Sequence, residues 1–279
     1  MVDAKKSFGQ HFLRDATVVA AILRAAEPEK FSLIVEVGPG NGVLTRAIVR
    51  ESQFALIEAD RDLIPALEQE FPSAKVIFAD AARVDYADIC RQLSRGQLSA
   101  PTVRWLLVGN LPYNAANAII MNALESECPP ERMVVMVQKE VGERMLGLTP
   151  QSRGVLTVAV QMYADVERIC TVKPGAFVPP PKVDSMVLRL TKGRRTAFTP
   201  DRVIALAKIG FANRRKQLHR NLADAGVAPS DVVKKHLVDI GLTASARAEE
   251  LSMEQWVHLC SVLPKPEPRV VLSTTREGK

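Results

Sequence analysis

A group of glycines follows the first strongly apolar segment of the chain, in the sequence VEVGPGNG. Gly38, Gly40 and Gly42 have G-x-G-x-G spacing, and Glu36 precedes them. A strand that runs into closely spaced glycines and then a helix forms a tight turn, where a ligand can touch the backbone, here at Gly38 and Gly40. The dinucleotide fingerprint G-x-G-x-x-G would need glycine at position 43, which is Val43. The pattern therefore disfavours a nicotinamide or flavin cofactor.

Acidic residues stand at the ends of the next two predicted strands. Glu58 follows Gly38 by 20 residues, where a carboxylate can accept hydrogen bonds from two ribose hydroxyls, and Asp80 could receive an adenine amino group. Glu36 is a third acid beside the loop, and no lysine or arginine occurs from residue 33 to residue 44 to compensate a pyrophosphate. S-adenosylmethionine, a nucleoside with a sulfonium and an ammonium group, suits such a pocket better. We therefore expect S-adenosylmethionine as the cofactor.

The fourth predicted strand runs directly into Asn110, Leu111, Pro112 and Tyr113. Strand ends form the ligand crevice of an open α/β sheet, so this tetrapeptide is expected to face the cofactor. The Asn110 side-chain oxygen and a backbone carbonyl, for which we favour Leu111, could accept both N–H bonds of an adenine amino group. The nitrogen lone pair, otherwise delocalised into the ring, could then point at a methyl group. Pro112 would stiffen the turn and Tyr113 would stack on the base, so the chemistry needs positioning rather than a tuned pKa.

Strand-like and helix-like segments alternate from residue 31 to residue 146, which predicts βαβ units and a largely parallel sheet. The expected strands are apolar throughout, as when helices cover both faces of a sheet. They cover residues 33–37, 54–57, 75–79, 103–108 and 133–138. The expected helices cover residues 43–51, 62–71, 116–124 and 139–146.

The pattern changes further along the chain. Residues 155–163, 166–172 and 185–190 are strand-like, and no long helix separates the last two, so we expect antiparallel pairing at one edge of the sheet. Residues 173–184 contain four prolines and should form an extended loop. Residues 1–192 are thus predicted to form a doubly wound, mostly parallel seven-stranded α/β sheet.

A second, smaller domain is expected because 279 residues exceed one typical core. Residues 193–264 are predicted to form a small all-helical domain. Its helical patterns cover residues 201–212, 216–225, 230–238 and 252–263. Residues 265–279 are proline-rich and then polar, which predicts a flexible tail.

Positive charge is concentrated around the start of the helical domain. From Arg189 to Arg220, ten lysines and arginines accompany one acid, so this segment carries +9 while the whole chain carries +6. A concentrated basic segment predicts a nucleic-acid partner, although a solvated helix surface would have the same composition. The candidate RNA contacts are Arg194, Arg195, Arg214, Arg215, Lys216 and Arg220.

Other features of the sequence narrow the class of protein. The four cysteines are too far apart for paired metal ligands or a disulfide framework, and the four histidines are scattered, so we expect no metal. No uncharged apolar segment approaches the roughly 18 residues of a membrane span, and the first 15 residues lack the apolar core of a secretory signal. A cytoplasmic protein without a membrane partner is expected.

Five motifs, in this order, resemble those of the ribosomal RNA adenine dimethyltransferase family. They are FGQHFL at residues 8–13, VEVGPGNGVLT at 35–45, the acidic strand ends at 58 and 80, NLPYN at 110–114 and FVPPPKVDSMVLRL at 177–190. The match is closest to the bacterial small-subunit (16S) enzymes. The resemblance covers residues 5–192, and the basic helical domain also fits. It implies a Rossmann-like methyltransferase fold.

The resemblance also implies roles for residues at matching positions. Cofactor contacts would be His11, Leu13, Gly38, Glu58, Asp80 and Asn110. Many family members have asparagine in place of His11, so a backbone contact is expected there. Phe177 would form a second aromatic wall around the target base, facing Tyr113, unless it anchors its loop in the core.

The implied substrate is a pair of neighbouring adenosines in a hairpin loop near the 3′ end of 16S rRNA. Four methyl groups would be transferred to each RNA, by a monomer. Three alternatives stay open: the related large-subunit (23S) adenine methyltransferase that confers macrolide resistance, a DNA adenine methyltransferase, and an RNA-binding ribosome-assembly factor without catalysis. FVPPPKVDS and the long helical appendage favour the small-subunit enzyme, and no separate domain for recognising DNA is evident.

Overall fold

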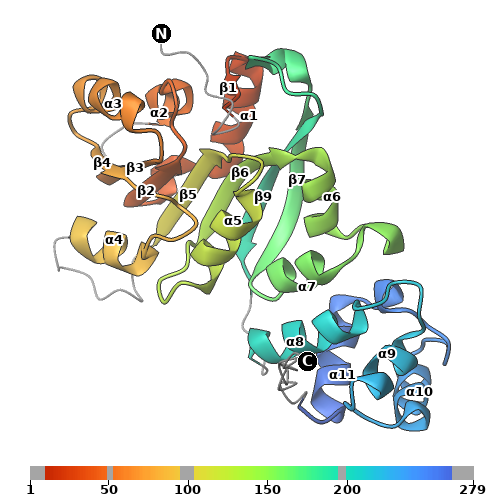
Figure 1. The fold of residues 1–279 in the computed structure, drawn as a ribbon. Coiled ribbons are helices and arrows are strands. Elements are labelled where there is room, and N and C mark those ends of the chain that lie inside the picture. The colour runs from red at the N-terminus through yellow and green to blue at the C-terminus, as the bar shows by residue number, and fades with distance from the viewer. Residues whose placement is uncertain (1–9, 49–52, 95–103, 194–198, 266–279) are drawn as a thin grey trace, which may run out of the picture. The chain divides into compact units, whose positions relative to one another are not determined.

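The computed structural model describes residues 10–48, 53–94, 104–193 and 199–265. Contacts within the chain divide it into two units, Met1–Arg195 and Thr196–Lys279. The first unit contains a seven-stranded sheet and the second contains helices (Figure 1). No helix in the described part of the chain has the length and apolar character needed to cross a membrane.

The seven-stranded sheet has the order β4-β3-β2-β5-β6-β9-β7. Its strands are β2 (Leu33–Val37), β3 (Gln53–Glu58), β4 (Lys75–Phe78), β5 (Trp105–Asn110), β6 (Arg132–Gln138), β7 (Ala164–Val172) and β9 (Ser185–Lys192). The pairs from β4 to β6 are parallel, whereas β9 runs antiparallel to both β6 and β7. The predicted mostly parallel sheet, and its antiparallel pairing at one edge, are confirmed.

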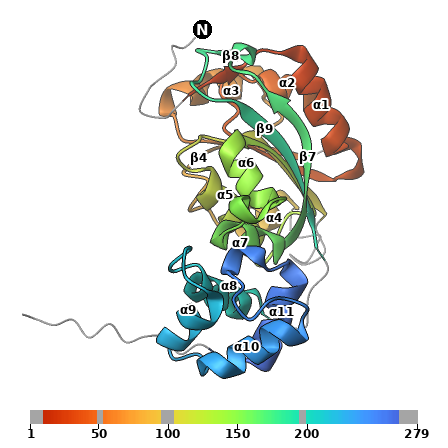
Figure 2. The same ribbon diagram turned by 90° about the vertical axis from the view of Figure 1, so that its right-hand side faces the viewer.

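Helices cover both faces of this sheet (Figures 1 and 2). One face packs against α1 (Ala16–Ala26), α2 (Val43–Ile48) and α3 (Ile64–Glu70). The other packs against α4 (Tyr86–Leu93), α5 (Ala116–Glu125), α6 (Lys139–Leu146) and α7 (Val155–Gln161). Because side chains alternate along a strand, Ile34 enters the first core while Leu33 and Val35 enter the second. This two-sided burial explains why the strand sequences are apolar throughout.

Local sequence sets several helix boundaries. Asp15 accepts hydrogen bonds from the backbone N–H groups of Thr17 and Val18 and caps α1, while Asp85 caps α4 in the same way. These caps satisfy donors that have no partner within the helix. Short 3-10 helices lie at Pro28–Lys30, Arg61–Leu63, Pro150–Ser152, Pro174–Ala176 and Ala248–Glu250.

The prediction of a strand over residues 155–163 is wrong. Residues Val155–Gln161 form α7, which packs against α6 and β7 and buries Val158 and Val160. A short apolar run fits a buried strand and a buried helix equally well, and here the tertiary packing selects the helix. Helices α1 and α4 had no counterpart among the expected elements.

The proline-rich segment at residues 173–184 is also more ordered than expected. It contains β8 (Phe177–Val178), which pairs antiparallel with β1 (Phe12–Leu13) in a separate two-stranded sheet. Phe12 pairs with Val178 and Leu13 with Phe177. Two segments about 165 residues apart thus join, which local sequence could not indicate.

The helical unit contains α8 (Pro200–Gly210), α9 (Leu218–Asp224), α10 (Ser230–Asp239) and α11 (Met253–Val262). Its core includes Leu206, Leu218, Leu237 and Trp256, each at most 1% exposed. All four predicted helices are present, with ends within three residues of those expected. Arg194, Arg195 and almost all of the predicted tail lie outside the described residues.

We predict that Gly109→Ala destabilises the protein because a Cβ there would lie 2.4 Å from the Val37 carbonyl oxygen, between β5 and β2. Backbone must shift to relieve this clash, so the free energy of unfolding in urea should fall by about 1–3 kcal/mol. Gly175→Ala is the control, because a Cβ there meets nothing within 4 Å, and its effect should stay within about 0.5 kcal/mol. Equal effects of the two substitutions would contradict this account of the β2–β5 contact.

Candidate functional site

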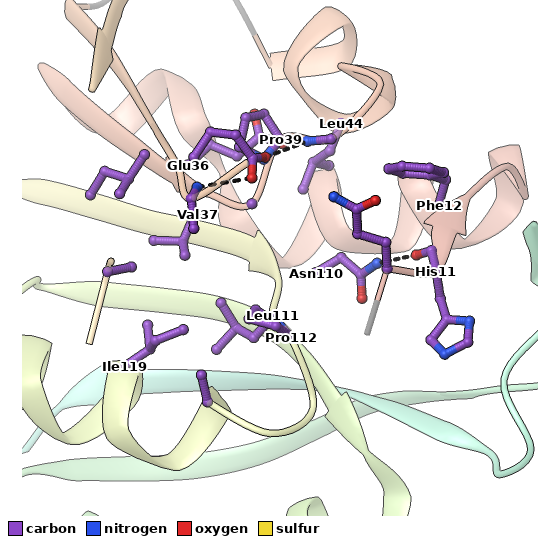
Figure 3. Close-up of a pocket in the computed structure, with 18 of the residues that line it drawn as sticks. His11, Phe12, Glu36, Val37, Pro39, Leu44, Asn110, Leu111, Pro112 and Ile119 are labelled. Carbon is purple, nitrogen blue, oxygen red and sulfur yellow. Dashed lines mark hydrogen bonds between the residues drawn. The ribbon is translucent and has the colours of Figure 1, made fainter. Parts of the chain in front are cut away.

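A cavity of about 430 Å³ opens at the carboxyl ends of β2, β3, β4 and β5 (Figure 3). Its volume lies in the range of small-molecule sites. It collects side chains from segments that are far apart in the sequence. The predicted site residues that line it are His11, Leu13, Gly38, Gly40, Glu58, Asp80, Asn110, Leu111, Pro112 and Tyr113.

The glycine loop brings backbone to the cavity wall. Gly38, Gly40 and Gly42 have φ values of 68°, 54° and 70°, a left-handed backbone conformation that residues with a Cβ rarely adopt. A Cβ on Gly40 would lie 2.9 Å from the Phe12 ring, and one on Gly38 would lie 3.5 Å from the Asn110 carbonyl oxygen. Glycine is therefore required by backbone conformation throughout the loop and by close approach at Gly40.

Glu58 is buried at the end of β3 and its carboxylate is held by backbone donors. Its Oε1 accepts hydrogen bonds of 2.9 Å from the N–H groups of Ala59 and Asp60, and its Oε2 accepts one of 3.3 Å from Gly40. Burial raises the pKa of Glu58 although these hydrogen bonds oppose the shift. The long Gly40 bond leaves Oε2 the better placed of the two oxygens to accept a ligand hydroxyl.

Glu36 is the second buried acid, only 1% exposed at the end of β2. Burial raises its pKa to about 8, a shift that the hydrogen bond from Thr45 Oγ1 to Glu36 Oε2 (2.7 Å) opposes and that nearby Glu58 reinforces. A carboxyl group in this state is largely protonated at neutral pH. A cationic ligand in the cavity would favour its ionised form.

Asp80 is more exposed than the other two acids. Its Oδ1 accepts a 3.0 Å hydrogen bond from the Ala82 N–H group, and its Oδ2 lies 3.6 Å from Arg83 Nε. The side chain is 55% exposed, so the Arg83 ion pair is weak. Asp80 can therefore turn to a ligand amino group at little cost.

The orientation of the Asn110 side chain is fixed by a carbonyl group. Asn110 Nδ2 donates a 2.8 Å hydrogen bond to the backbone oxygen of His11, the dashed line beside Asn110 in Figure 3. A carbonyl oxygen can only accept, so the amide nitrogen must face His11. The amide oxygen Oδ1 then remains to accept a hydrogen bond from a ligand.

Two backbone carbonyls in the same turn differ in whether they already accept hydrogen bonds. The Pro112 carbonyl accepts hydrogen bonds from the N–H groups of Ala115 and Ala116 at the start of α5. Among the described residues, no N–H group donates to the Leu111 carbonyl, whereas the Leu111 N–H group donates to the Met136 carbonyl. Leu111 therefore offers the available backbone acceptor next to Asn110.

Two contacts hold the Tyr113 ring. Its hydroxyl lies 2.6 Å from Ser185 Oγ, and its ring centroid lies 5.6 Å from that of His11, at an interplanar angle of 30°. His11 is itself tied down, because its Nδ1 donates a 2.8 Å hydrogen bond to the Pro179 carbonyl. Burial raises the pKa of Tyr113, so its hydroxyl stays protonated near neutral pH. Ser185 was not among the residues expected at the site, although it lies within the FVPPPKVDS motif.

Phe177 is not brought to this cavity. Its side chain is 1% exposed and packs in the core cluster with Leu13, Val19 and Ile22. This is the loop anchor that the sequence left as an alternative. The aromatic ring that lies next to Tyr113 is instead that of His11. A wall role for Phe177 stays a prediction that would require its ring to leave the core.

This sheet and cavity define a Rossmann-like methyltransferase, and comparison with known proteins agrees. The family model for ribosomal RNA adenine dimethylase matches residues 1–265. Ribosomal RNA small subunit methyltransferase A of Thermosynechococcus vestitus is 38% identical over 276 residues, covering 94% of this chain and 98% of that relative. The protein of the same name from Anaeromyxobacter sp. (strain K) is 38% identical over 262 residues, covering 92% of each chain. The chain therefore belongs to the ribosomal RNA adenine dimethylase family.

Solved structures are similar over most of the chain. The 23S rRNA methyltransferase ErmE has a TM-score of 0.71 at 25% identity, covering 90% of this chain and 98% of its own. A dimethyladenosine transferase from Plasmodium falciparum has a TM-score of 0.72 at 21% identity, covering 89% and 96%. At 21% identity, the similarity to the Plasmodium protein shows that the two proteins share a fold.

We predict that Glu36 makes the stability of the ligand-free protein depend on pH. In the native state Glu36 keeps its proton near neutral pH. In the unfolded chain its pKa is near 4.5, so the proton is released. Unfolding free energy should therefore fall as the pH rises from about 5 to 8, and Glu36→Gln should reduce this fall by a few kcal/mol. Urea unfolding at several pH values measures both slopes. Identical slopes for the two proteins would show that Glu36 is ionised in the folded state.

Proposed function

We propose that this protein transfers methyl groups from S-adenosylmethionine to N6 of two adjacent adenosines in a hairpin loop near the 3′ end of 16S rRNA, giving N6,N6-dimethyladenosine. The observation that carries this proposal is the oriented Asn110 amide, whose oxygen remains available in a cavity that also contains buried carboxyl groups. Membership of the adenine dimethylase family supports the same chemistry.

The cofactor would be held by its ribose, adenine and charged groups. Glu58 would accept hydrogen bonds from the ribose hydroxyls and Asp80 one from the adenine amino group. Gly38 and Gly40 would let the cofactor approach the backbone, and a side chain on Gly40 would also clash with Phe12. The acidic cavity would compensate the sulfonium and ammonium charges. S-adenosylmethionine supplies the methyl group.

The reaction would depend on positioning the target amine. In the first transfer, Asn110 Oδ1 and the Leu111 carbonyl would accept the two N6 hydrogens, which localises the nitrogen lone pair and directs it to the methyl carbon. In the second transfer, one hydrogen remains for these acceptors to hold. The base would stack on Tyr113, while Pro112 limits the freedom of the turn. After transfer, the nitrogen loses its excess proton to water. His11 and Leu13 would close the cavity at the β1 segment, where the His11 carbonyl holds Asn110.

The small-subunit RNA is favoured as substrate by the relatives that share the whole chain. Two of them, each 38% identical and matched over at least 92% of their length, are named small subunit methyltransferases. The large-subunit alternative is supported by the similarity to ErmE, at 25% identity. We infer that the protein acts as a monomer on the small ribosomal subunit or its precursor, in the cytoplasm.

The helical unit would bind RNA through its basic segment. Arg214, Arg215 and Arg220 are exposed, and Lys216 is partly exposed. Arg214 pairs with Glu249 at 3.2 Å and Lys216 pairs with Asp224. Each pair has one exposed member and one partly exposed member, and ion pairs near the surface are weak, so the cations can exchange these partners for phosphates. Arg194 and Arg195, which lie outside the described residues, are proposed to extend this surface.

Asn110→Ala should reduce methyl transfer about 100-fold or more, because it removes the acceptor that orients the amine. Transfer is measured with labelled S-adenosylmethionine and undermethylated small subunits, followed by mapping of the modified nucleotides. Asn110→Asp should not restore activity, because one carboxylate oxygen would face the His11 carbonyl oxygen and be repelled. RNA binding should remain within about threefold of wild type.

Three outcomes would contradict this assignment. Undiminished transfer by Asn110→Ala would remove Asn110 from the mechanism. Modification of large-subunit RNA alone by the wild-type protein would favour the ErmE-like activity. Absence of any transfer, together with normal RNA binding, would favour an assembly factor.

Replacing Arg214, Arg215 and Lys216 by alanine should weaken RNA binding and reduce its dependence on salt. Each lost phosphate contact should lower the slope of log K against log salt concentration by about one. The matched control replaces Lys30, Lys75 and Arg104, three cations at or before the amino ends of strands, opposite the cavity. An unchanged slope, or equal changes in both triple variants, would assign the basic segment to an ordinary solvated surface.

A further inference from the structure

We propose that Ser185 is a positioning residue for methyl transfer: its hydroxyl fixes the plane of the Tyr113 ring and, through it, the plane of the target adenine. This inference rests on the proposed function. It is carried by the 2.6 Å contact between Tyr113 Oη and Ser185 Oγ and by the rigid place of Ser185 in the sheet.

Ser185 is held from both sides. It is the first residue of β9, and it pairs with Gln138 of β6 and with Val172 of β7. Its side chain is 0% exposed, and the adjacent Asp184 carbonyl accepts a 2.9 Å hydrogen bond from the Lys139 N–H group. A hydroxyl in this place has a fixed position, since neither the strand nor the rotamer is free to move.

Tyr113 lies in a different kind of environment. It belongs to the turn between β5 and α5, and it is only partly buried on the cavity wall. Without a tether at its hydroxyl, such a ring could turn about its side-chain bonds. The neutral hydroxyl pair with Ser185 ties the far end of the ring to the sheet. The ring plane is therefore set by β9 rather than by the turn alone.

Asn110 and Tyr113, which are proposed to bind the adenine, are thus fixed in place by different segments of the chain. Asn110 is oriented by the His11 carbonyl, next to β1, and Tyr113 is oriented by Ser185 on β9. The angle between the stacked base and the amide oxygen decides whether the N6 lone pair points at the methyl group. A displacement of about 1 Å in such an arrangement can cost about 100-fold in rate.

The test is a double-mutant cycle with Ser185→Ala, Tyr113→Phe and the double variant, assayed on undermethylated small subunits. Tyr113→Phe keeps the stacking ring and removes the same hydrogen bond from its other end. Each single variant should lower kcat about tenfold, with KM for the subunits within about threefold of wild type. The double variant should be no slower than the slower single variant, because both substitutions remove one interaction.

Thr157→Val is the matched control for losing a buried hydroxyl. Thr157 is 4% exposed, and its Oγ1 donates to the Arg144 carbonyl on α6 and accepts a 3.0 Å hydrogen bond from the Gly154 N–H group. This variant should lose stability to a similar extent as Ser185→Ala while kcat stays at the wild-type value. All assays are made below the unfolding temperature of the least stable variant, measured in parallel.

Three results would overturn the inference. The first is a wild-type kcat in Tyr113→Phe. The second is a double variant whose kcat is lowered by the product of the two single effects. The third is a decrease of kcat in Thr157→Val equal to that in Ser185→Ala. If Ser185→Ala does not fold, Tyr113→Phe still decides, because it must show the tenfold loss. Failure of the wild-type protein to methylate subunits would instead refute the proposed function, so the two failures are distinguishable.

Discussion

The parallel pairing of β2 with β5 is the constraint on which the site depends. Glu36 pairs with Val108 in this ladder, so the glycine loop after β2 and the turn after β5 leave the same edge of the sheet side by side. Gly38 then lies beside the Asn110 carbonyl, whose oxygen would be 3.5 Å from a Cβ on Gly38. Strand order changes direction at β2, which pairs with β3 on one side and β5 on the other, and ligands of open α/β sheets bind at such points.

Electrostatics and geometry have separate roles at this edge. Burial of Glu36 and Glu58 raises the pKa of both acids and disfavours their ionised forms, which matches a cationic ligand better than an anionic one. The reacting amine, by contrast, needs acceptors with fixed directions. Asn110 Nδ2 is bonded to the His11 carbonyl and the Tyr113 hydroxyl to Ser185, so in the proposed reaction hydrogen bonds from remote segments would set these directions.

Much of the site could be predicted from sequence because its main parts are local. The glycine loop is required by left-handed backbone at Gly38 and Gly40, and a glycine pattern records that requirement directly. Glu58, Asp80 and Asn110 could be placed together because each ends or follows a strand, and the carboxyl ends of parallel strands meet at one edge. The order of the strands within the sheet was not needed for that inference.

Sequence alone determined the alternation of strands and helices, the glycine loop and the acids at the strand ends, because each depends on neighbouring residues. Only the tertiary structure decided that residues 155–161 form a helix, since their apolar run suits either element and packing against α6 selects one. It also decided that Phe177 lies in the core and that Ser185 reaches Tyr113. These contacts join residues far apart in the chain, and no local pattern specifies which distant side chain fills a given space.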